Sequence, residues 1–270
     1  MKNVLTIDVE GIEHSRFERC APRVGSFNLD LIDKPLVELL NLLDRFDAKA
    51  TFFILGEVAE SMPELVRLIY SKGHEVASHG YRHHPVYLLK PEEFREDLLR
   101  SKEIIEDIIG ERILGYRAPY WSITDKNLWA MDIIKSCGLL YDSSISPAVN
   151  FLYGMKSAER ITYFHSAGFW EVPPTTLRIL NKVVIVAGGF YLRALPYWLT
   201  KNYVDLINKK KRYAIFYLHP HELLNYYFKE KFSLRENFIL NYKKHTFRNK
   251  LFRALEDFKF QTLREALALK

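Results

Sequence analysis

Short apolar stretches alternate with amphipathic helical patterns along almost all of this 270-residue chain. Such alternation predicts a sheet of mostly parallel strands covered by helices, and the chain length favours an α/β barrel over an open doubly wound sheet. Strands are expected at residues 3–8, 50–55, 75–78, 114–116, 139–141, 171–173, 183–187 and 213–218. Helices are expected from Pro35 onward and at residues 64–71, 91–109, 125–137, 195–208, 247–258 and 263–269.

The composition indicates one domain. Hydrophobic residues make up 48% of the chain and no Pro-, Gly- or Ser-rich linker divides it, so we expect a single domain over residues 1–270. Cys20 and Cys137 lie far apart and form no disulfide or metal-binding pattern, which indicates a reducing environment. Asp8 comes too early for a signal-peptide core, and the longest apolar run, residues 183–192, is too short to span a membrane. These features predict a cytoplasmic location.

Side chains that could act in catalysis or bind a metal follow the ends of the expected strands. They are Asp8 and Glu10, His79 and His83, Arg117, Asp142, and His219. In a barrel of parallel strands these ends form one face of the molecule, where catalytic groups converge. The sequence therefore predicts one site assembled from distant segments.

His79 and His83 are four residues apart, so one turn of backbone places both imidazoles on the same side. A hydrolytic metal needs a third ligand and an open position for water, and either Asp8 or Glu10 could supply the carboxylate. This ligand set suits zinc, with cobalt, nickel or manganese as other candidates. The second carboxylate is then available as a general base, because residues i and i+2 of an extended backbone point to the same side.

Arg117 could pair with that base and keep it ionised. His219 could protonate a leaving group if Asp142 orients its ring. Together with the expected metal, this set describes hydrolysis of an amide or ester.

The ordered stretches TIDVEG, SHGYRHH, RAPYWS, YDSSISP and FYLHP resemble the five motifs of the polysaccharide deacetylase family, carbohydrate esterase family four. The likeness is greatest to the subgroup whose first motif is Asp-x-Asp/Glu, and residues 171–173 and 188–197 are also similar to that subgroup. The resemblance implies a distorted (β/α) barrel with about seven parallel strands. It also implies metal-dependent removal of N-acetyl, sometimes O-acetyl, groups from sugars.

The first two motifs imply the base and the metal ligands. Asp8 matches the general base, and His79 and His83 match the metal-binding histidines. The common pattern has two adjacent acids, but here Val9 stands in the second place and the carboxylate follows at Glu10. The resemblance thus leaves Glu10 as the expected carboxylate ligand.

The remaining motifs imply the other roles. Arg117 matches the arginine that pairs with the base, and Tyr120 matches the residue whose backbone N–H helps bind the oxyanion. Asp142 matches the carboxylate that orients the acid, and His219 matches the acid itself. Trp121 is expected to line the sugar site, since an aromatic face suits a pyranose ring.

Two alternatives stay open. Relatives with weakened metal motifs include metal-independent amidohydrolases that act on small cyclic amides such as allantoin. A non-catalytic carbohydrate-binding protein could use the same fold, although it would not need both Asp8 and His219.

A basic segment at residues 225–253 carries eight Lys/Arg against two Glu, and 8 − 2 = +6 equals the net charge of the whole chain. No nucleic-acid motif accompanies it. We expect an acetylated sugar substrate, carried on a phosphate-bearing lipid or nucleotide, with possible peripheral contact at the inner face of an anionic membrane. The expected contacts are Lys243, Lys244, Arg248 and Lys250; the sequence indicates no oligomeric state.

Overall fold

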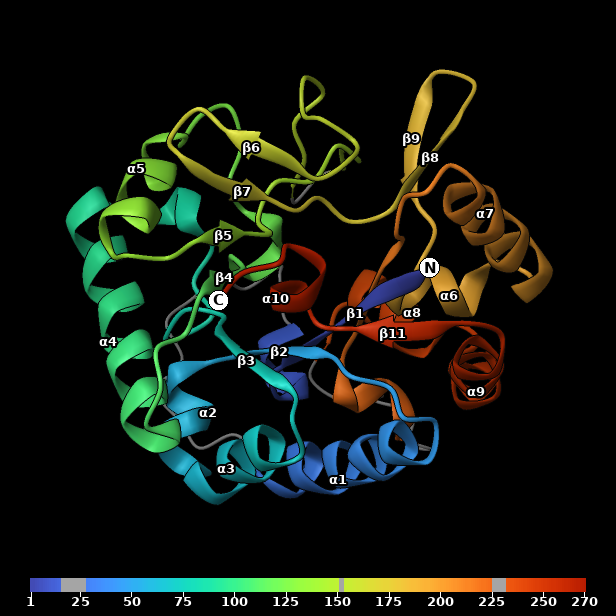
Figure 1. Cartoon of the computed structure of the whole chain (residues 1–270), viewed down its shortest axis with the longest axis horizontal. Helices are drawn as coiled ribbons and strands as arrows, with labels where there is room; N and C mark the ends of the chain where they lie inside the picture. The colour runs from blue at the N-terminus through green and yellow to red at the C-terminus, as the bar shows by residue number, and fades with distance from the viewer. Residues whose placement is uncertain (16–27, 151–152, 225–231) are drawn as a thin grey trace. The chain divides into compact units, whose positions relative to one another are not determined.

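The computed structural model describes residues 1–15, 28–150, 153–224 and 232–270 (Figure 1). These residues form two compact units, of which unit 1 is Met1–Thr51 with Val186–Lys270 and unit 2 is Phe52–Ile185. The expectation of one domain over the whole chain stays a prediction.

The strands of unit 1 are parallel. β1 (Lys2–Val9) pairs with β10 (Ile215–Leu218) and with β11 (Lys259–Gln261). β1 is buried from its second residue to its last, so its aliphatic run packs on both faces of the sheet. Its pairing with β10 sets Ile7 opposite Leu218, which places the ends of these two strands next to each other.

Six α-helices belong to the described part of unit 1. They are α1 (Asp30–Arg45), α6 (Gly189–Ala194), α7 (Tyr197–Lys209), α8 (Leu234–Asn241), α9 (Phe247–Asp257) and α10 (Leu263–Ala266). Its 3₁₀ turns are η1 (Ile12–Ser15), η4 (Pro220–Leu223) and η5 (Lys244–Thr246). α1 begins before the expected start at Pro35, because the Asn28 side chain accepts the backbone N–H of Asp30 and satisfies a helix-terminal donor.

The main sheet of unit 2 has the strand order β2 (Thr51–Ile54), β3 (Glu75–Ser78), β4 (Gly115–Tyr116), β5 (Tyr141–Asp142), β7 (Phe169–Glu171) and β6 (Tyr163–His165). β3, β4, β5 and β7 run parallel, and β6 closes the edge antiparallel to β7. β8 (Thr176–Ile179) and β9 (Lys182–Ile185) form a separate antiparallel hairpin.

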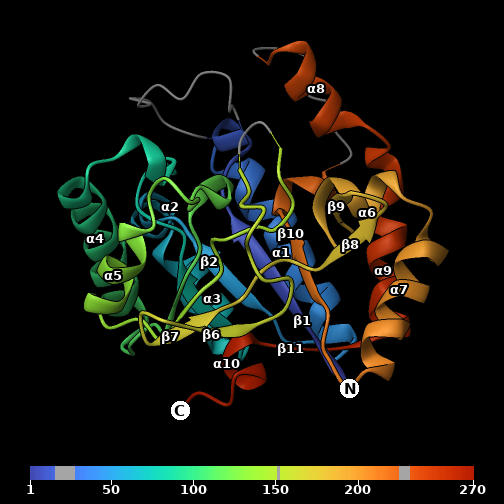
Figure 2. The same cartoon turned by 90° about the horizontal axis from the view of Figure 1, so that it is seen from above.

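The helices of unit 2 are α2 (Gly56–Ser61), α3 (Pro63–Ser71), α4 (Pro91–Ile109) and α5 (Trp129–Ser136), with 3₁₀ turns η2 (Val86–Leu88) and η3 (Pro119–Trp121). α4 lies beside α2, α3 and α5 (Figures 1 and 2). Its bounds match the prediction, because Pro91 begins it and Gly110 ends it in the left-handed conformation. α5 begins later than expected, since the Asn127 side chain bonds to Ser122 and Thr124 and holds the preceding segment as a turn.

Candidate active-site residues

Asp8, Glu10 and His219 come together in unit 1. β1 ends around Asp8, β10 ends just before His219, and these strands are neighbours. His219 Nε2 lies 3.9 Å from Asp8 Oδ2 and 3.8 Å from Glu10 Oε1. Both carboxylates are buried, each with 4% of its surface exposed, so their charges act on the imidazole with little screening.

The opposite side of the His219 ring faces Glu222, in the turn η4. Glu222 Oε2 lies 3.6 Å from His219 Nδ1 and accepts the backbone N–H of His219 at 3.1 Å. Burial disfavours the imidazolium, but contact with Glu222 and the charges of Glu10 and Asp8 outweigh it and raise the pKa of His219 to about 9. The site therefore favours the proton-carrying form that a general acid requires.

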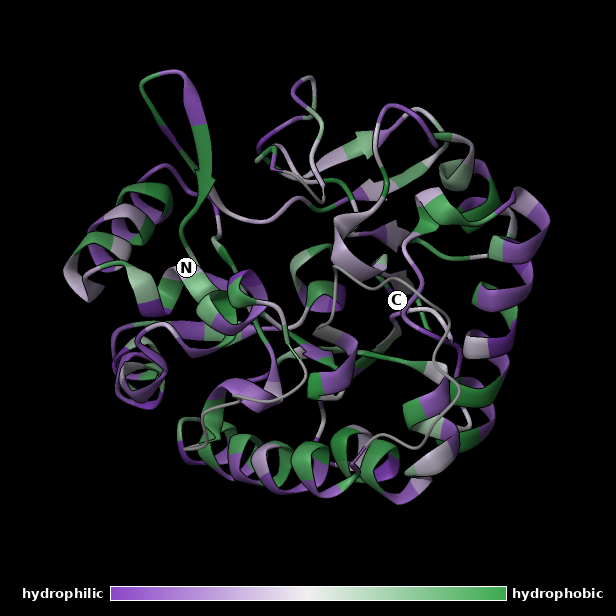
Figure 3. Cartoon of the chain, turned by 180° about the vertical axis from the view of Figure 1, so that it is seen from behind, coloured by the Kyte–Doolittle hydropathy of each residue, from purple (hydrophilic) through white to green (hydrophobic). Residues whose placement is uncertain are grey.

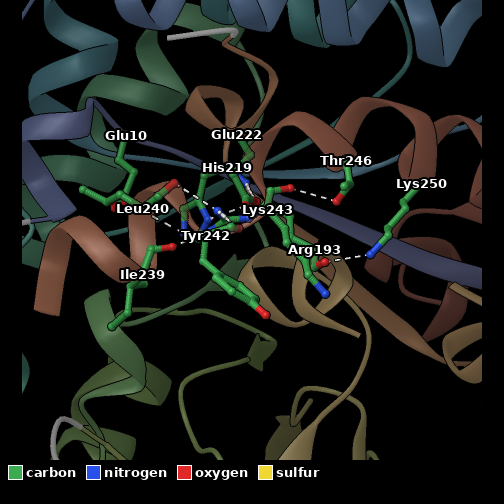
Figure 4. A network of polar contacts seen from close by, with 10 residues as sticks. All are labelled: Glu10, Arg193, His219, Glu222, Ile239, Leu240, Tyr242, Lys243, Thr246 and Lys250. Carbon is green, nitrogen blue, oxygen red and sulfur yellow. Dashed lines mark hydrogen bonds and ion pairs between the residues drawn. The ribbon is translucent and has the colours of Figure 1, made fainter. Parts of the chain in front are cut away.

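Arg193 anchors Glu222, and its Nε lies 3.0 Å from Glu222 Oε1 (Figure 4). Its other donors bind three carbonyls at the end of α8: Nη1 donates to Leu240 and Tyr242, and Nη2 donates to Ile239. Burial raises the pKa of Glu222, but contact with the His219 ring and the charge of Arg193 outweigh this and lower it to about 2. The main chain of α8 is thus connected to His219 through two buried side chains.

In unit 2, His79 follows β3 directly and is held in one tautomer. Its Nδ1 lies 2.7 Å from the backbone carbonyl of Arg117. Because a carbonyl only accepts, Nδ1 carries the hydrogen and Nε2 carries the lone pair that would bind a metal. The ring of His83 lies 5.2 Å from that of His79 and 4.6 Å from that of Tyr120, so the two histidines are adjacent as the sequence predicts.

A turn, rather than a helix, brings the two histidines together. Gly80 and His83 both have positive φ, at 79° and 57°. Asp97 of α4 accepts the backbone N–H groups of Tyr81 and Arg82 at 2.7 and 3.3 Å. A side chain at residue 80 would meet Asp97 at 2.9 Å, so glycine lets the carboxylate hold this turn.

Arg117 and the segment after it are tightly packed. The Arg117 side chain is 1% exposed, its Nη2 donates to Ser143 Oγ at 3.0 Å, and its guanidinium lies 4.2 Å above the ring of Phe53. Tyr120 and Trp121 follow with φ of 58° and 48°. Left-handed backbone at bulky residues costs about 1–3 kcal/mol each and is concentrated at functional sites.

Asp142 lies beside Glu171, because the two residues are in register on the neighbouring strands β5 and β7. Both are completely buried. Burial raises the pKa of Asp142 to about 6, and burial together with the charge of Asp142 raises the pKa of Glu171 well above its usual value. Ser144 donates to Asp142 through its hydroxyl and its backbone N–H, which favours the ionised form of Asp142.

The catalytic and metal roles expected for these residues stay predictions. Sequence reasoning missed Glu222, Arg193, Asp97 and Glu171. The sequence did contain a signal for Glu222, because a glutamate three residues after His219 has the spacing of a capping box. The partners of Arg193 and Asp97 are contacts between distant segments and leave no local pattern.

The cations of the basic segment are more engaged in contacts within the protein than the sequence suggested. Residues 225–231 of this segment lie outside the described chain. Lys244 is buried, and burial followed by the charge of the nearby arginine lowers its pKa to about 7. Lys250 donates to two backbone carbonyls at the end of α6, and Arg248 forms an ion pair with α1. Packing engages Lys244 and hydrogen bonds engage Lys250, and the expected phosphate contacts of these cations stay a prediction.

Comparisons with known proteins agree with the motifs. Residues 32–141 match the polysaccharide deacetylase family, and residues 143–268 match a domain of unknown function (DUF3473). The peptidoglycan deacetylase-like protein FGM2 of Gibberella zeae is 32% identical over 169 residues, covering 61% of this chain and 49% of that protein. A peptidoglycan deacetylase of Helicobacter pylori is 29% identical over 161 residues, covering 58% of this chain and 54% of the relative. The chain thus spans about half the length of these relatives.

A solved Mycobacterium smegmatis protein assigned to the polysaccharide deacetylases has a TM-score of 0.65 and 19% identity, covering 99% of this chain and 90% of its own. This likeness confirms the predicted fold class, an α/β barrel-like fold. The sequence match to the polysaccharide deacetylase family covers residues 32–141 of the chain. Among the described residues, none of the helices combines the length and hydropathy that crossing a bilayer requires.

Proposed function

We propose that this protein is a metal-dependent hydrolase that removes N-acetyl groups from a sugar of a cell-surface polysaccharide or its precursor. The match of residues 32–141 to the polysaccharide deacetylase family and the deacetylase names of the relatives support this activity. The observation that carries it is the position of His219 beside the buried carboxylates of Asp8 and Glu10, at the ends of neighbouring strands. An acid beside carboxylates is what amide hydrolysis needs, because one proton leaves water and another reaches the amine.

The proposed ligands of the metal are Glu10, His79 and His83. Two imidazoles and one carboxylate fit zinc or a similar divalent ion. The hydrogen bond at His79 Nδ1 leaves the lone pair of Nε2 available to bind that ion. A bound divalent ion would acidify water and polarise the acetyl carbonyl. Zinc as the native ion, a cytoplasmic location and a lipid- or nucleotide-linked substrate are parts of this proposal that metal analysis, cell fractionation and substrate screening would test.

In this proposal Asp8 accepts the proton of the attacking water, and the backbone N–H of Tyr120 stabilises the oxyanion of the acetyl group. The C–N bond then breaks, and His219 donates its proton to the departing sugar amine. The products are acetate and the free amine, so one water is consumed in each turnover. Glu222 keeps the His219 ring in place throughout.

The deciding experiment measures acetate release by purified protein from N-acetylglucosamine oligomers and peptidoglycan fragments. The same assay is repeated after the metal has been removed by a chelator and again after metal has been added back. We expect activity that chelator abolishes and zinc restores. Activity on a cyclic amide that survives complete metal removal would instead support the amidohydrolase alternative, and sugar binding without turnover of either substrate would support a non-catalytic protein.

A further inference from the structure

The β8–β9 hairpin presents bare apolar side chains to solvent. Ile179 and Lys182 form its last cross-strand pair, and a two-residue turn of Leu180 and Asn181 joins the strands. Leu180 is 91% exposed and Ile179 is 49% exposed. Apolar and hydrophilic stretches alternate along this hairpin (Figure 3). The tip therefore offers aliphatic surface that the protein leaves uncovered.

Leucine is an unfavourable residue for this turn. Leu180 has a φ of 52°, in the left-handed region that glycine or asparagine adopts at little cost. Its exposure means that it buries almost no surface in return. Leu180 therefore combines an unfavourable backbone conformation with an exposed apolar side chain and gains no packing in return. Such a combination is expected where function requires it.

The charged residues of the hairpin are both cations. Arg178 precedes Ile179, Lys182 follows the turn, and both cations are exposed. The sequence has no Asp or Glu between Glu171 and Asp205. An anionic partner would thus meet the tip without a repelling carboxylate on the hairpin or on the chain around it.

Hydrogen bonds from Arg160 hold the base of the hairpin in place. Arg160 donates from Nη2 to the carbonyl of Thr176 at 2.8 Å and from Nε to its hydroxyl at 3.3 Å. Thr176 pairs with Ile185 at the same end, and both are buried. A fixed base loses little further freedom when the tip binds, which favours binding.

We propose that the β8–β9 hairpin inserts Ile179 and Leu180 into the interface of an anionic lipid bilayer, with Arg178 and Lys182 at the headgroups. A sugar chain would call for aromatic faces, and the tip has none. Aliphatic side chains flanked by cations are the pattern of interfacial anchors. This surface is independent of the proposed deacetylase activity and of the basic segment at residues 225–253.

The test is sedimentation of the full chain with vesicles of phosphatidylglycerol and phosphatidylcholine, compared with phosphatidylcholine alone. We expect binding to the anionic vesicles. Leu180→Asp should lower the partition constant about tenfold or more, and Arg178→Gln and Lys182→Gln about fivefold each. The matched control is Leu234→Asp, because Leu234 on α8 is 92% exposed and lies in the basic segment. It should bind as the parent does.

A second variant separates binding from folding. Leu180→Gly removes the apolar side chain and relieves the positive φ, so the melting temperature should stay equal or rise while vesicle binding falls. Equal binding by the parent and Leu180→Asp would overturn the proposal, as would equal losses in Leu180→Asp and Leu234→Asp. Absence of binding to anionic vesicles would overturn it too, and so would Leu180-dependent binding of N-acetylglucosamine oligomers in place of vesicles.

Discussion

Replacing Glu222 by glutamine should destabilise the protein in a way that depends on pH. The change keeps the shape of a buried side chain but removes the charge that lies 3.0 Å from Arg193 and 3.6 Å from His219. Lowering the pKa of Glu222 from 4.5 to about 2 corresponds to about 3 kcal/mol in favour of the folded carboxylate. Removing one partner of a buried ion pair costs about 3–5 kcal/mol, which agrees with that figure.

The sign of the pH effect follows from the lowered pKa. The contribution of Glu222 to the free energy of unfolding is fully present above pH 4.5, its value in the unfolded chain, and is lost as pH falls toward about 2. Urea unfolding of the parent and of Glu222→Gln should therefore differ by about 3 kcal/mol at pH 7 and converge in acid. kcat should fall by about 10²-fold with a smaller change in KM, because His219, the proposed acid, loses its orientation.

Two controls make this reasoning refutable. Glu265 makes the same capping bond, to Thr262, but is exposed, so Glu265→Gln should cost less than about 1 kcal/mol. Arg193→Met should cost more than Glu222→Gln, because it also leaves three carbonyls without their donor. The double variant should cost less than the sum of the two single changes. Additive losses, or equal losses at pH 7 and in acid, would refute the coupling.

Other variants test the remaining site residues. Asp8→Asn should lower turnover by about 10²–10⁴-fold while the protein keeps its metal, whereas Glu10→Gln should empty the site; metal analysis showing the reverse would exchange the two roles. His219→Ala should abolish acetate release with metal content unchanged, and undiminished release would remove it as the acid. Glu171→Gln keeps a donor for Asp142 and should be nearly neutral at low pH. Above pH 4.5 the parent should lose stability, because the carboxyl ionises in the unfolded chain while the fold keeps it protonated; the variant should lose less, as urea unfolding at several pH values would show.

Elements with local signals were predictable from the sequence. α4 carries proline at its start, glycine after its end and apolar residues at helical spacing between them, so both bounds match. β3 is a short apolar run before the histidine turn, and its bounds match as well. The placement of His79 and Arg117 after strands followed from the same patterns.

Elements that depend on distant partners were not predictable. β11 is three residues long and becomes a strand only by pairing with β1, which is more than 250 residues away. α8 has no clear apolar face, and the carbonyls at its end are satisfied by Arg193 from another part of the chain. Glu171 was expected only as a strand residue, since its position beside Asp142 follows from strand order and register, which the sequence does not reveal.

Arg193 donates to the backbone carbonyl oxygens of Ile239, Leu240 and Tyr242. Alanine at these three positions keeps every one of those oxygens, so it would leave this link to His219 untouched. Deleting one residue within α8 would rotate the helix end by about 100° and move the oxygens away from the guanidinium. Maps of functional residues that are built from side-chain substitutions will therefore overlook the end of α8, and single-residue deletions will reveal it.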